Sequence, residues 1–237
     1  MIQLSPRLQQ VAQYVQQYAP QNEVVLCDVG SDHAYLPSYL LLNNHIAKAI
    51  AGEVVEGPFR AAQKMKEAYS FKDRLSVRLG DGLSVIKEND QVNVITICGM
   101  GGVLIRDILN EGQQAIKPNT LLILQPNMAS NHVRKWISDH ESSIIDEIIV
   151  EDHGRLYEVI VAIYQKSGPK LTYNEELFGP INLKKQDKYF VTYWSNELNK
   201  LKNVQQQMTH SQQVDEDKVI YIKERIKSIE EVLLNDD

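Results

Sequence analysis

The stretch from residue 24 to residue 37, VVLCDVGSDHAYLP, constrains the fold of this chain more than any other. An apolar run ends in Asp28 and Gly30, and the chain then turns into a segment with helical spacing. Acid, glycine and helix start in this order are typical of the first strand–loop–helix unit of a nucleotide-binding α/β sheet. The stretch therefore predicts a Rossmann-like fold with a ligand at the carboxyl end of this strand.

The loop after this strand lacks the second glycine of the dinucleotide fingerprint, because Asp32 occupies that place. A pyrophosphate needs close approach of the backbone, whereas an adenosyl ligand without phosphates tolerates a side chain there. We therefore predict S-adenosylmethionine as the cofactor. Gly30 by itself fits an ordinary strand-to-helix turn equally well, so the prediction depends on the ends of the other strands.

Beyond this loop, short apolar runs alternate with segments of helical spacing. We predict strands at residues 24–29, 47–55, 75–79, 92–98 and 121–124, with helices near residues 35–42, 58–69, 103–116 and 130–140. Strands separated by helices are typical of a parallel sheet with right-handed crossovers. No helix separates residues 144–150 from residues 157–164, which predicts an antiparallel hairpin at one edge of the sheet.

Helical patterns also flank this region. Ser5 and Pro6 are typical of a capping residue and a first helical residue. Near the other end, residues 191–208 and 219–233 have apolar residues at a three–four spacing, and the polar residues 209–213 form the expected turn. We predict a methyltransferase-like α/β domain at residues 1–166 and a C-terminal domain at residues 167–237, in which two antiparallel helices form a coiled-coil-like hairpin. In the alternative, both helices fold back and complete the main core.

Composition excludes several classes of protein. Hydrophobic residues make up 43% and charged residues 24% of the 237, which is typical of a globular protein. No apolar run approaches the ~18 residues of a membrane-spanning helix, and the first residues do not resemble a signal peptide. Cys27 and Cys98 fall in or at the end of predicted strands, so we expect reduced thiols and a cytoplasmic location. Histidine and cysteine spacing predicts no metal site.

Carboxylates follow the next two predicted strands. Glu53 comes 23 residues after Gly30, where an acid can accept hydrogen bonds from both ribose hydroxyls. Asp81 is expected to accept from the exocyclic amine of adenine, near the backbone of Gly82, although Asp-Gly is also a common turn pair. Asp28 binds the amino group of the cofactor or holds the loop. We expect the three carboxylates to converge on one site.

The fourth predicted strand ends in CGMGG, residues 98–102, where a methyl donor would face its acceptor. Methyltransferases that act on exocyclic amines often carry Asn/Asp-Pro-Pro-aromatic here, and this chain does not. A ring nitrogen such as adenine N1 presents its lone pair without losing a proton, so it needs no such acceptors. Gly99 and its neighbours therefore favour ring-nitrogen methylation, unless the glycines only make the loop flexible enough to admit the ligand.

Five side chains are candidates for contacts with a target base. Asp32 can accept from an adenine amine or stabilise the cation formed by methylation, while His33 either orients the base or caps the following helix. Asn127 can offer an amide to a base edge. Tyr35 and Tyr157 can stack on a flipped base, although a tyrosine at either position can also belong to the core.

These segments together resemble the bacterial tRNA (adenine-22, N1)-methyltransferases. The matching segments are LSPRL (4–8), DVGSDHAYLP (28–37), AGEVVEGP (51–58), RLGDGL (78–83), ICGMGG (97–102) and LQPN (124–127). The resemblance implies a class I methyltransferase that moves a methyl group from S-adenosylmethionine to N1 of an adenine in the D-arm of tRNA. It also implies cofactor roles for Asp28, Gly30, Glu53, Asp81 and Gly99, and active-site roles for Asp32, His33 and Asn127.

A tRNA substrate would require local basic patches, because the net charge of the chain is −6. The candidates are Arg7, Arg60, Lys64, Lys66, Lys72, Arg74, Arg78, Arg134, Lys135 and Arg155. In the alternative, those near residue 60 are the solvated side of a helix. We expect Arg7, Arg60 and the C-terminal hairpin to hold tRNA, and the protein to be a monomer.

Two other classes of function remain open at this stage. A methyltransferase for another RNA position, a small molecule or a protein would share the cofactor residues but would not need a helical hairpin. A non-catalytic RNA-binding or scaffolding protein would keep the fold and lose donor binding. The presence of both Glu53 and Asp81 argues against the second class.

Overall fold

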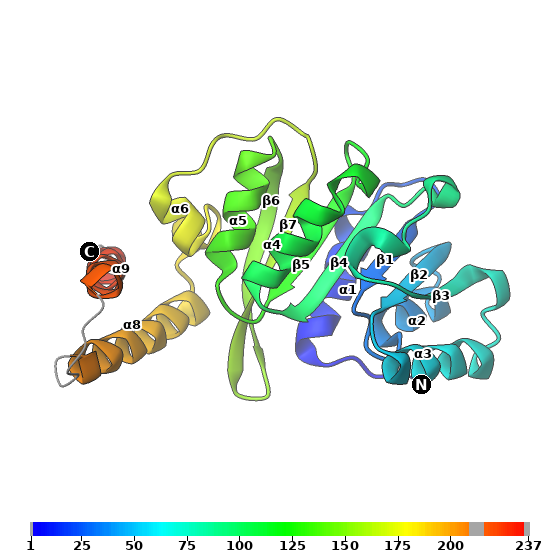
Figure 1. The fold of residues 1–237 in the computed structure, drawn as a ribbon, viewed down its shortest axis with the longest axis horizontal. Helices are drawn as coiled ribbons and strands as arrows, with labels where there is room; N and C mark the ends of the chain where they lie inside the picture. Colours follow the sequence, from blue (N-terminus) through cyan, green and yellow to red (C-terminus); the bar gives the residue numbers. More distant parts are fainter. Residues whose placement is uncertain (1, 209–215, 235–237) are drawn as a thin grey trace. The chain divides into compact units, whose positions relative to one another are not determined.

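The computed structural model describes residues 2–208 and 216–234, which form two compact units, Met1–Ile181 and Asn182–Asp237 (Figure 1). The structure divides the chain between Ile181 and Asn182, which is downstream of the boundary that we predicted after residue 166. The intervening residues belong to the first unit because helix α6 (Tyr173–Phe178) packs against helix α5 (Ser130–Asp139). The backbone N–H of Ile181 also donates to Glu147 Oε2 at 3.0 Å, within the same unit.

The first unit is built on a seven-stranded sheet in the order β3-β2-β1-β4-β5-β7-β6. Its strands are β1 (Val25–Val29), β2 (Lys48–Glu53), β3 (Leu75–Leu79), β4 (Val94–Met100), β5 (Leu121–Pro126), β6 (Ser143–Asp152) and β7 (Arg155–Ile163). The first five are parallel, and β7 runs antiparallel to both β5 and β6. The predicted parallel sheet with an antiparallel edge hairpin is confirmed.

Helices cover both faces of this sheet (Figure 1). Helices α1 (Pro6–Tyr18), α2 (Tyr35–Leu42) and α3 (Glu56–Ala68) contribute to one apolar core, and α4 (Gly102–Glu111) and α5 contribute to the other. In β1, Leu26 belongs to the first core and Cys27 to the second. A strand buried on both faces reads as a continuous apolar run, which is why the sequence pattern located these strands well.

The start of α1 and the turn of the β6–β7 hairpin show how local sequence shapes the fold. Ser5 occupies the N-cap position and Pro6 begins α1, as predicted, but the hydroxyl of Ser5 makes no capping hydrogen bond within the described residues. The β6–β7 hairpin turns through His153 and Gly154, whose φ angles are +50° and +75°. Positive φ at both central residues is typical of the tight turns that match the twist of a hairpin.

The second unit contains α7 (Asn182–Lys185), α8 (Lys188–Met208) and α9 (Glu216–Leu234). Helices α8 and α9 are in contact, and Lys202 Nζ lies 2.6 Å from Glu230 Oε1. In Figure 1, α8 runs across the view while α9 is seen nearly end-on, so the predicted coiled-coil-like pairing is not confirmed. The expected turn at residues 209–213 lies outside the described residues. Within the described residues, no helix has the length and apolar character needed to cross a membrane.

Candidate active site

A cavity of about 300 Å³ opens where β1, β4 and β5 end. It gathers most of the predicted site residues, because the carboxyl ends of parallel strands meet at one edge of the sheet. Its lining residues are Arg7, Leu8, Asp28, Gly30, Ser31, Asp32, Tyr35, Leu36, Cys98, Gly99, Met100, Asn127 and Tyr157.

The loop after β1 is held in an unusual backbone conformation. Gly30 has a φ of +64°, and residues 32–34 follow with φ of +42°, +67° and +58°. The carbonyl of Gly52 accepts from the N–H groups of Gly30 at 2.9 Å and Ser31 at 3.2 Å, which fixes the loop to β2. Non-glycine residues at positive φ are costly and cluster at binding and catalytic sites. The loop is therefore a pre-shaped part of the cavity wall.

Asp28 is buried beneath this loop. Its two carboxylate oxygens accept from Ser31 Oγ at 2.5 Å and from Thr96 Oγ1 at 2.6 Å. Burial raises the pKa of Asp28 to about 6, although both hydroxyls lower it. Of the two roles that we predicted for Asp28, these bonds match the one in which it holds the loop.

Glu53 ends β2 next to the same loop, and only 5% of it is exposed. Burial and the nearby charge of Asp28 raise the pKa of Glu53 to about 7, while a hydrogen bond from the backbone of Asp32 lowers it. Its Oε1 is buried and has no hydrogen-bond partner within the described part of the chain. Buried acceptors are almost always paired in native proteins, so this oxygen fits a donor supplied by a ligand.

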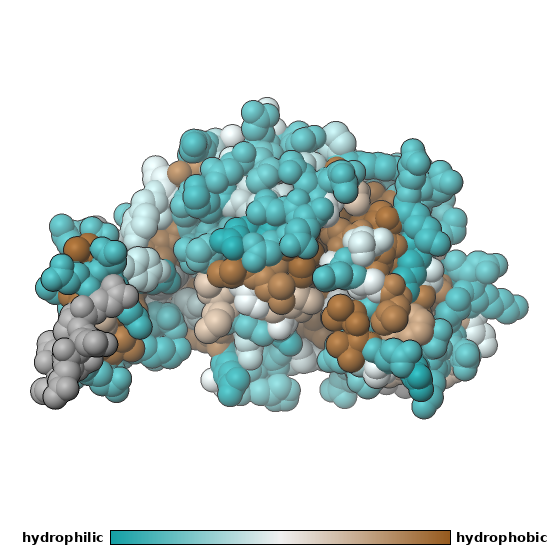
Figure 2. Space-filling view, in the orientation of Figure 1, coloured by the Kyte–Doolittle hydropathy of each residue, from teal (hydrophilic) through white to brown (hydrophobic). Residues whose placement is uncertain are grey.

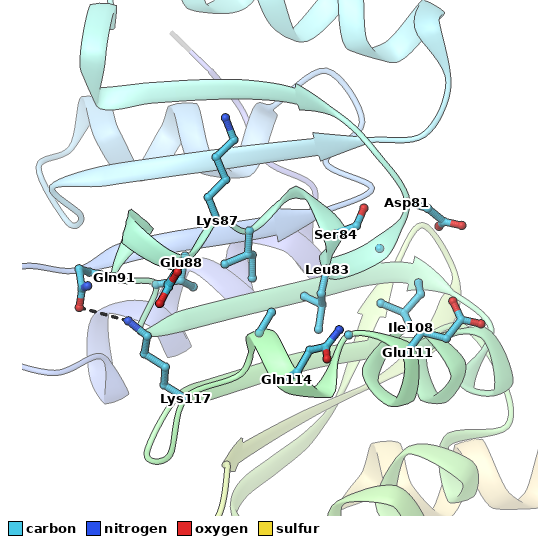
Figure 3. Close-up of a pocket in the computed structure, with 15 residues that line it drawn as sticks. Asp81, Leu83, Ser84, Lys87, Glu88, Gln91, Ile108, Glu111, Gln114 and Lys117 are labelled. Atoms are coloured by element: carbon cyan, nitrogen blue, oxygen red, sulfur yellow. Dashed lines mark hydrogen bonds between the residues drawn. The ribbon is translucent and has the colours of Figure 1, made fainter.

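Asp81 and Gly82 follow β3, as predicted, but they do not line the cavity beside Asp28. They line a separate hollow of about 730 Å³, shown in Figure 3, that extends along α4 to Lys117. The loop is nevertheless tied to β2, because the N–H of Gly80 donates to the carbonyl of Glu53 at 2.8 Å. The three carboxylates follow β1, β2 and β3, which are neighbours in the sheet, over about 10 Å at the usual strand spacing, and their convergence on one ligand stays a prediction.

Arg7 reaches the opposite wall of the cavity from α1. Its Nη1 donates to Gln125 Oε1 and, at 3.3 Å, to Asn127 Oδ1. The guanidinium lies 5.0 Å from the centre of the Tyr157 ring, and Nε is 3.6 Å from Asp152 Oδ2. These partners hold Arg7 toward the protein, with 22% of its side chain exposed, rather than toward solvent where tRNA phosphates would lie.

The side-chain amide of Asn127 also forms hydrogen bonds within the protein. Its Nδ2 donates to the carbonyl of Gly99 at 2.7 Å, and its Oδ1 accepts from Arg7 and, at 3.2 Å, from Gln125 Nε2. We did not single out Gln125, Met100 or Asp152 from the sequence. The only signal for Gln125 was its place beside Asn127 in the LQPN segment.

The mouth of the cavity carries the remaining candidates for base contacts. The rings of His33 and Tyr35 stack with centroids 5.5 Å apart, and His33 Nε2 lies 3.5 Å from Asp32 Oδ1. The Asp32 side chain is 82% exposed and the His33 side chain 47%, so a large ligand can reach both. Arg60 lies outside the cavity lining and pairs with Glu56 at 2.8 Å on the surface of α3.

Three of the basic candidates are bound internally. Arg134 is fully buried, and its guanidinium pairs with Glu147 and Glu158 at 2.5 Å each. Arg78 forms a bidentate pair with Asp90, and Arg74 donates to three backbone carbonyls. These bonds use the guanidinium groups of Arg134 and Arg78 within the protein, whereas Arg74 is exposed and donates through Nε and Nη2, so a phosphate contact at Arg74 stays a prediction.

Exposed apolar side chains lie along the same edge of the sheet as the cavity. Figure 2 shows hydrophobic patches that interrupt a largely hydrophilic surface on the first unit. Exposed apolar residues stand at or just beyond the carboxyl ends of β2, β3 and β5 and at the start of α4: Val54, Val55, Leu79, Val103, Leu104 and Met128. Among the described residues, no group of three or more histidine, cysteine, aspartate or glutamate side chains is placed to hold a metal ion.

The chain as a whole is similar to known tRNA methyltransferases. Residues 26–231 match the family described as "TrmK: tRNA (adenine(22)-N(1))-methyltransferase". The chain is 37% identical over 240 residues to the Bacillus subtilis tRNA (adenine(22)-N(1))-methyltransferase, covering 98% of both chains.

Solved structures agree with this match. The crystal structure of the B. subtilis m1A22 tRNA methyltransferase TrmK superposes with a TM-score of 0.88 at 37% identity, covering 98% of this chain and 100% of that one. Streptococcus pneumoniae Sp1610, solved with S-adenosyl-L-methionine, has a TM-score of 0.85 at 39% identity, with coverage of 98% and 100%. These similarities extend over the α/β unit and the C-terminal helices alike.

Proposed function

Because the chain belongs to the tRNA (adenine(22)-N(1))-methyltransferase family, we propose that it transfers a methyl group from S-adenosylmethionine to N1 of adenine 22 in tRNA. The observation that carries the proposal is the buried Oε1 of Glu53, which has no partner among the residues that the structure describes and lies beside a strained loop at the sheet edge. A ligand with a ribose diol supplies the missing donors. When bound, S-adenosylmethionine provides an electrophilic methyl group.

The residues along the sheet edge suit the parts of this cofactor. Glu53 binds the ribose hydroxyls, and Asp28 keeps the loop of Gly30 in the shape that the ligand requires. Gly99 borders the cavity on the other side, at the end of β4. Asp81 and the backbone of Gly82 receive the adenine, two strands away from β1. An extended nucleoside with an amino-acid tail can span that distance.

The target adenine enters from the mouth of the cavity. Its N1 attacks with a lone pair, so no side chain has to remove a proton before methyl transfer. Asp32 stands at the mouth with an exposed carboxylate, where it stabilises the positive charge that methylation leaves on the ring. His33 and Tyr35 form a stacked pair that can continue onto a flipped base. Tyr157 borders the base from the opposite side.

Recognition of tRNA must use contacts besides salt bridges, because the chain is acidic overall. The apolar residues around the cavity can pack against unpaired bases, and Arg60 on α3 can reach a phosphate. We assign part of the grip on tRNA to the unit that contains α8 and α9. We place the reaction in the cytoplasm and infer a monomeric enzyme.

The direct test is methyl incorporation from labelled S-adenosylmethionine. The acceptors are an unmodified tRNA transcript, the same transcript with guanine at position 22, and free adenosine. We expect incorporation only into the first. Equal labelling of both transcripts would move the target to another RNA position, and labelling of adenosine would indicate a small-molecule enzyme. No labelling of any acceptor, with the donor bound, would favour a non-catalytic protein.

A further inference from the structure

Strand β4 does not pair regularly at the residue that borders the cavity. Cys98 pairs with Gln125 and Met100 pairs with Pro126, so Gly99 is an extra residue in β4. Its φ is +78°, a conformation that favours glycine. A bulge leaves the backbone N–H and C=O of the extra residue without partners in the ladder. Those two groups must then be satisfied in another way.

Two amide side chains take the place of the missing ladder bonds. Gln125 Oε1 accepts from the N–H of Gly99 at 2.9 Å, and Asn127 Nδ2 donates to the carbonyl of Gly99 at 2.7 Å. Each hydrogen bond requires one orientation of its amide. The oxygen of Gln125 must face Gly99, and so must the nitrogen of Asn127. The shape of the bulge therefore depends on the orientation of both amides.

Arg7 helps to set these orientations, together with Gln125 Nε2. That nitrogen donates to the carbonyl of Pro126 at 3.0 Å and to Asn127 Oδ1 at 3.2 Å. A guanidinium is a donor at every polar atom, so it can face only the oxygen of an amide. Arg7 contacts the oxygens of both Gln125 and Asn127, and if either amide rotated, its NH₂ would face the guanidinium. Asp152 balances the charge of Arg7, and Tyr157 lies against its guanidinium face.

The bulge decides the shape of the cavity wall. Met100 follows Gly99, and its Cε would lie 2.3 Å from a Cβ placed on Gly30, so its side chain covers the loop after β1. A change at Gly99 would move this side chain and the opening between the two loops. A chain of contacts thus links Arg7 on α1, far from β4 in the sequence, through Gly99 to the place where the donor is expected.

We propose that Arg7, acting through Gln125 and Asn127, is a positioning residue that holds the Gly99 bulge in the conformation that binds the methyl donor. The N-terminal helix thereby completes the active site. Asn127 is then a positioning residue rather than a contact to the target base, and Arg7 is not a phosphate contact. The identity of the donor rests on the proposed function, whereas the brace on Gly99 does not.

The test compares three variants with the wild-type protein. Arg7→Ala removes the guanidinium, Arg7→Lys keeps the charge but cannot span both amide oxygens, and Asn127→Asp keeps the acceptor for Arg7 while placing an oxygen against the Gly99 carbonyl. Lys48→Ala is the matched control. It removes an exposed cation at the start of β2, at the end of the sheet opposite to the carboxyl ends of the strands. Hydrogen exchange of the Gly99 amide is followed by NMR without ligand, and S-adenosylmethionine affinity by calorimetry.

We expect Gly99 exchange to accelerate about tenfold or more in both Arg7 variants and to stay unchanged in the control. All three site variants should bind S-adenosylmethionine about tenfold more weakly, the loss typical of a charged hydrogen bond. Affinity for tRNA, and its dependence on salt, should match the wild type. If Arg7→Lys does not restore donor affinity and Gly99 protection, Arg7 acts by positioning and not by its charge alone.

Several results would overturn the proposal. One is normal Gly99 exchange in both Arg7 variants. Another is donor affinity within about twofold of the wild type. Loss of tRNA affinity with a salt slope lower by about 0.9, donor binding being normal, would make Arg7 a phosphate contact. If Arg7→Ala does not fold, the other two variants decide. A wild-type protein that does not methylate tRNA would refute the proposed function and leave the Gly99 brace standing.

Discussion

Replacing Glu53 by glutamine should stabilise the protein without ligand while weakening its hold on the donor. Glutamine keeps the size of the side chain and an oxygen that can accept from the backbone of Asp32, but it removes the charge. Burial and Asp28 raise the pKa of Glu53 from 4.5 to about 7, so ionisation of this carboxylate opposes folding. At 1.36 kcal/mol per pKa unit, the stabilisation at pH 8.5 is about 3 kcal/mol at most.

The sign of the pH dependence follows from the same shift. The folded protein binds a proton at Glu53 more tightly than the unfolded chain does, so wild-type stability from this group is lost as pH rises from 4.5 through 7. The advantage of Glu53→Gln should therefore be largest above pH 7 and shrink toward pH 4.5. Thermal unfolding checks this, because about 1 kcal/mol shifts the melting temperature of a chain of this size by about 2–4 °C.

Donor binding should change in the opposite direction. The charge-assisted bonds from the ribose to Glu53 are worth about 1–3 kcal/mol, so calorimetry should show a loss of about 5- to 150-fold for Glu53→Gln. Because those bonds require the ionised form, wild-type affinity should rise with pH up to about 7 and the variant should show no such rise. A variant that is less stable at pH 8.5 and binds the donor normally would show that Glu53 is a structural carboxylate.

Three further changes test other parts of the site. Asp32→Ala should lower kcat more than donor affinity, because its carboxylate stands at the mouth; equal losses in both would assign Asp32 to the cofactor. Arg134→Ala should lower the melting temperature by about 10 °C, since Glu147 and Glu158 would keep buried, unbalanced charge; a shift below about 2 °C would show that these two ion pairs do not stabilise the fold. Removing residues 182–237 should leave donor binding intact and weaken tRNA binding at least about tenfold, so unchanged tRNA affinity would remove the second unit from recognition.

The fold could be predicted from the sequence because its central strands, such as β1 and β5, are buried on both faces. Residues 75–79 form β3 within the predicted limits, and α2 begins and ends where its spacing indicated. Strand β4 extends past the predicted end to Met100, because the bulge at Gly99 pairs through side chains rather than through an apolar pattern. Helix α6 was missed because it is a single short segment after the Ser167–Pro169 turn region.

The site was predicted in part, for a physical reason. Asp28 and Glu53 could be placed near the ends of β1 and β2 because the end of a parallel strand is a fixed place in the sheet. The roles of Arg7 and Gln125 depend on contacts between residues 118 positions apart, which no local pattern reveals. Arg134 was taken for a surface cation because its acidic partners lie on the β6–β7 hairpin, outside the helix that carries it.

The most direct measurement of the central claim is the position of the methyl group. Unmodified tRNA is incubated with the protein and labelled S-adenosylmethionine, and the product is examined by nucleoside mass spectrometry and by reverse transcription, which stops at N1-methyladenine. The account predicts one N1-methyladenine at position 22 from the wild-type protein and much less from Glu53→Gln. A methyl group on another nucleoside or position, or equal product from both proteins, would contradict it.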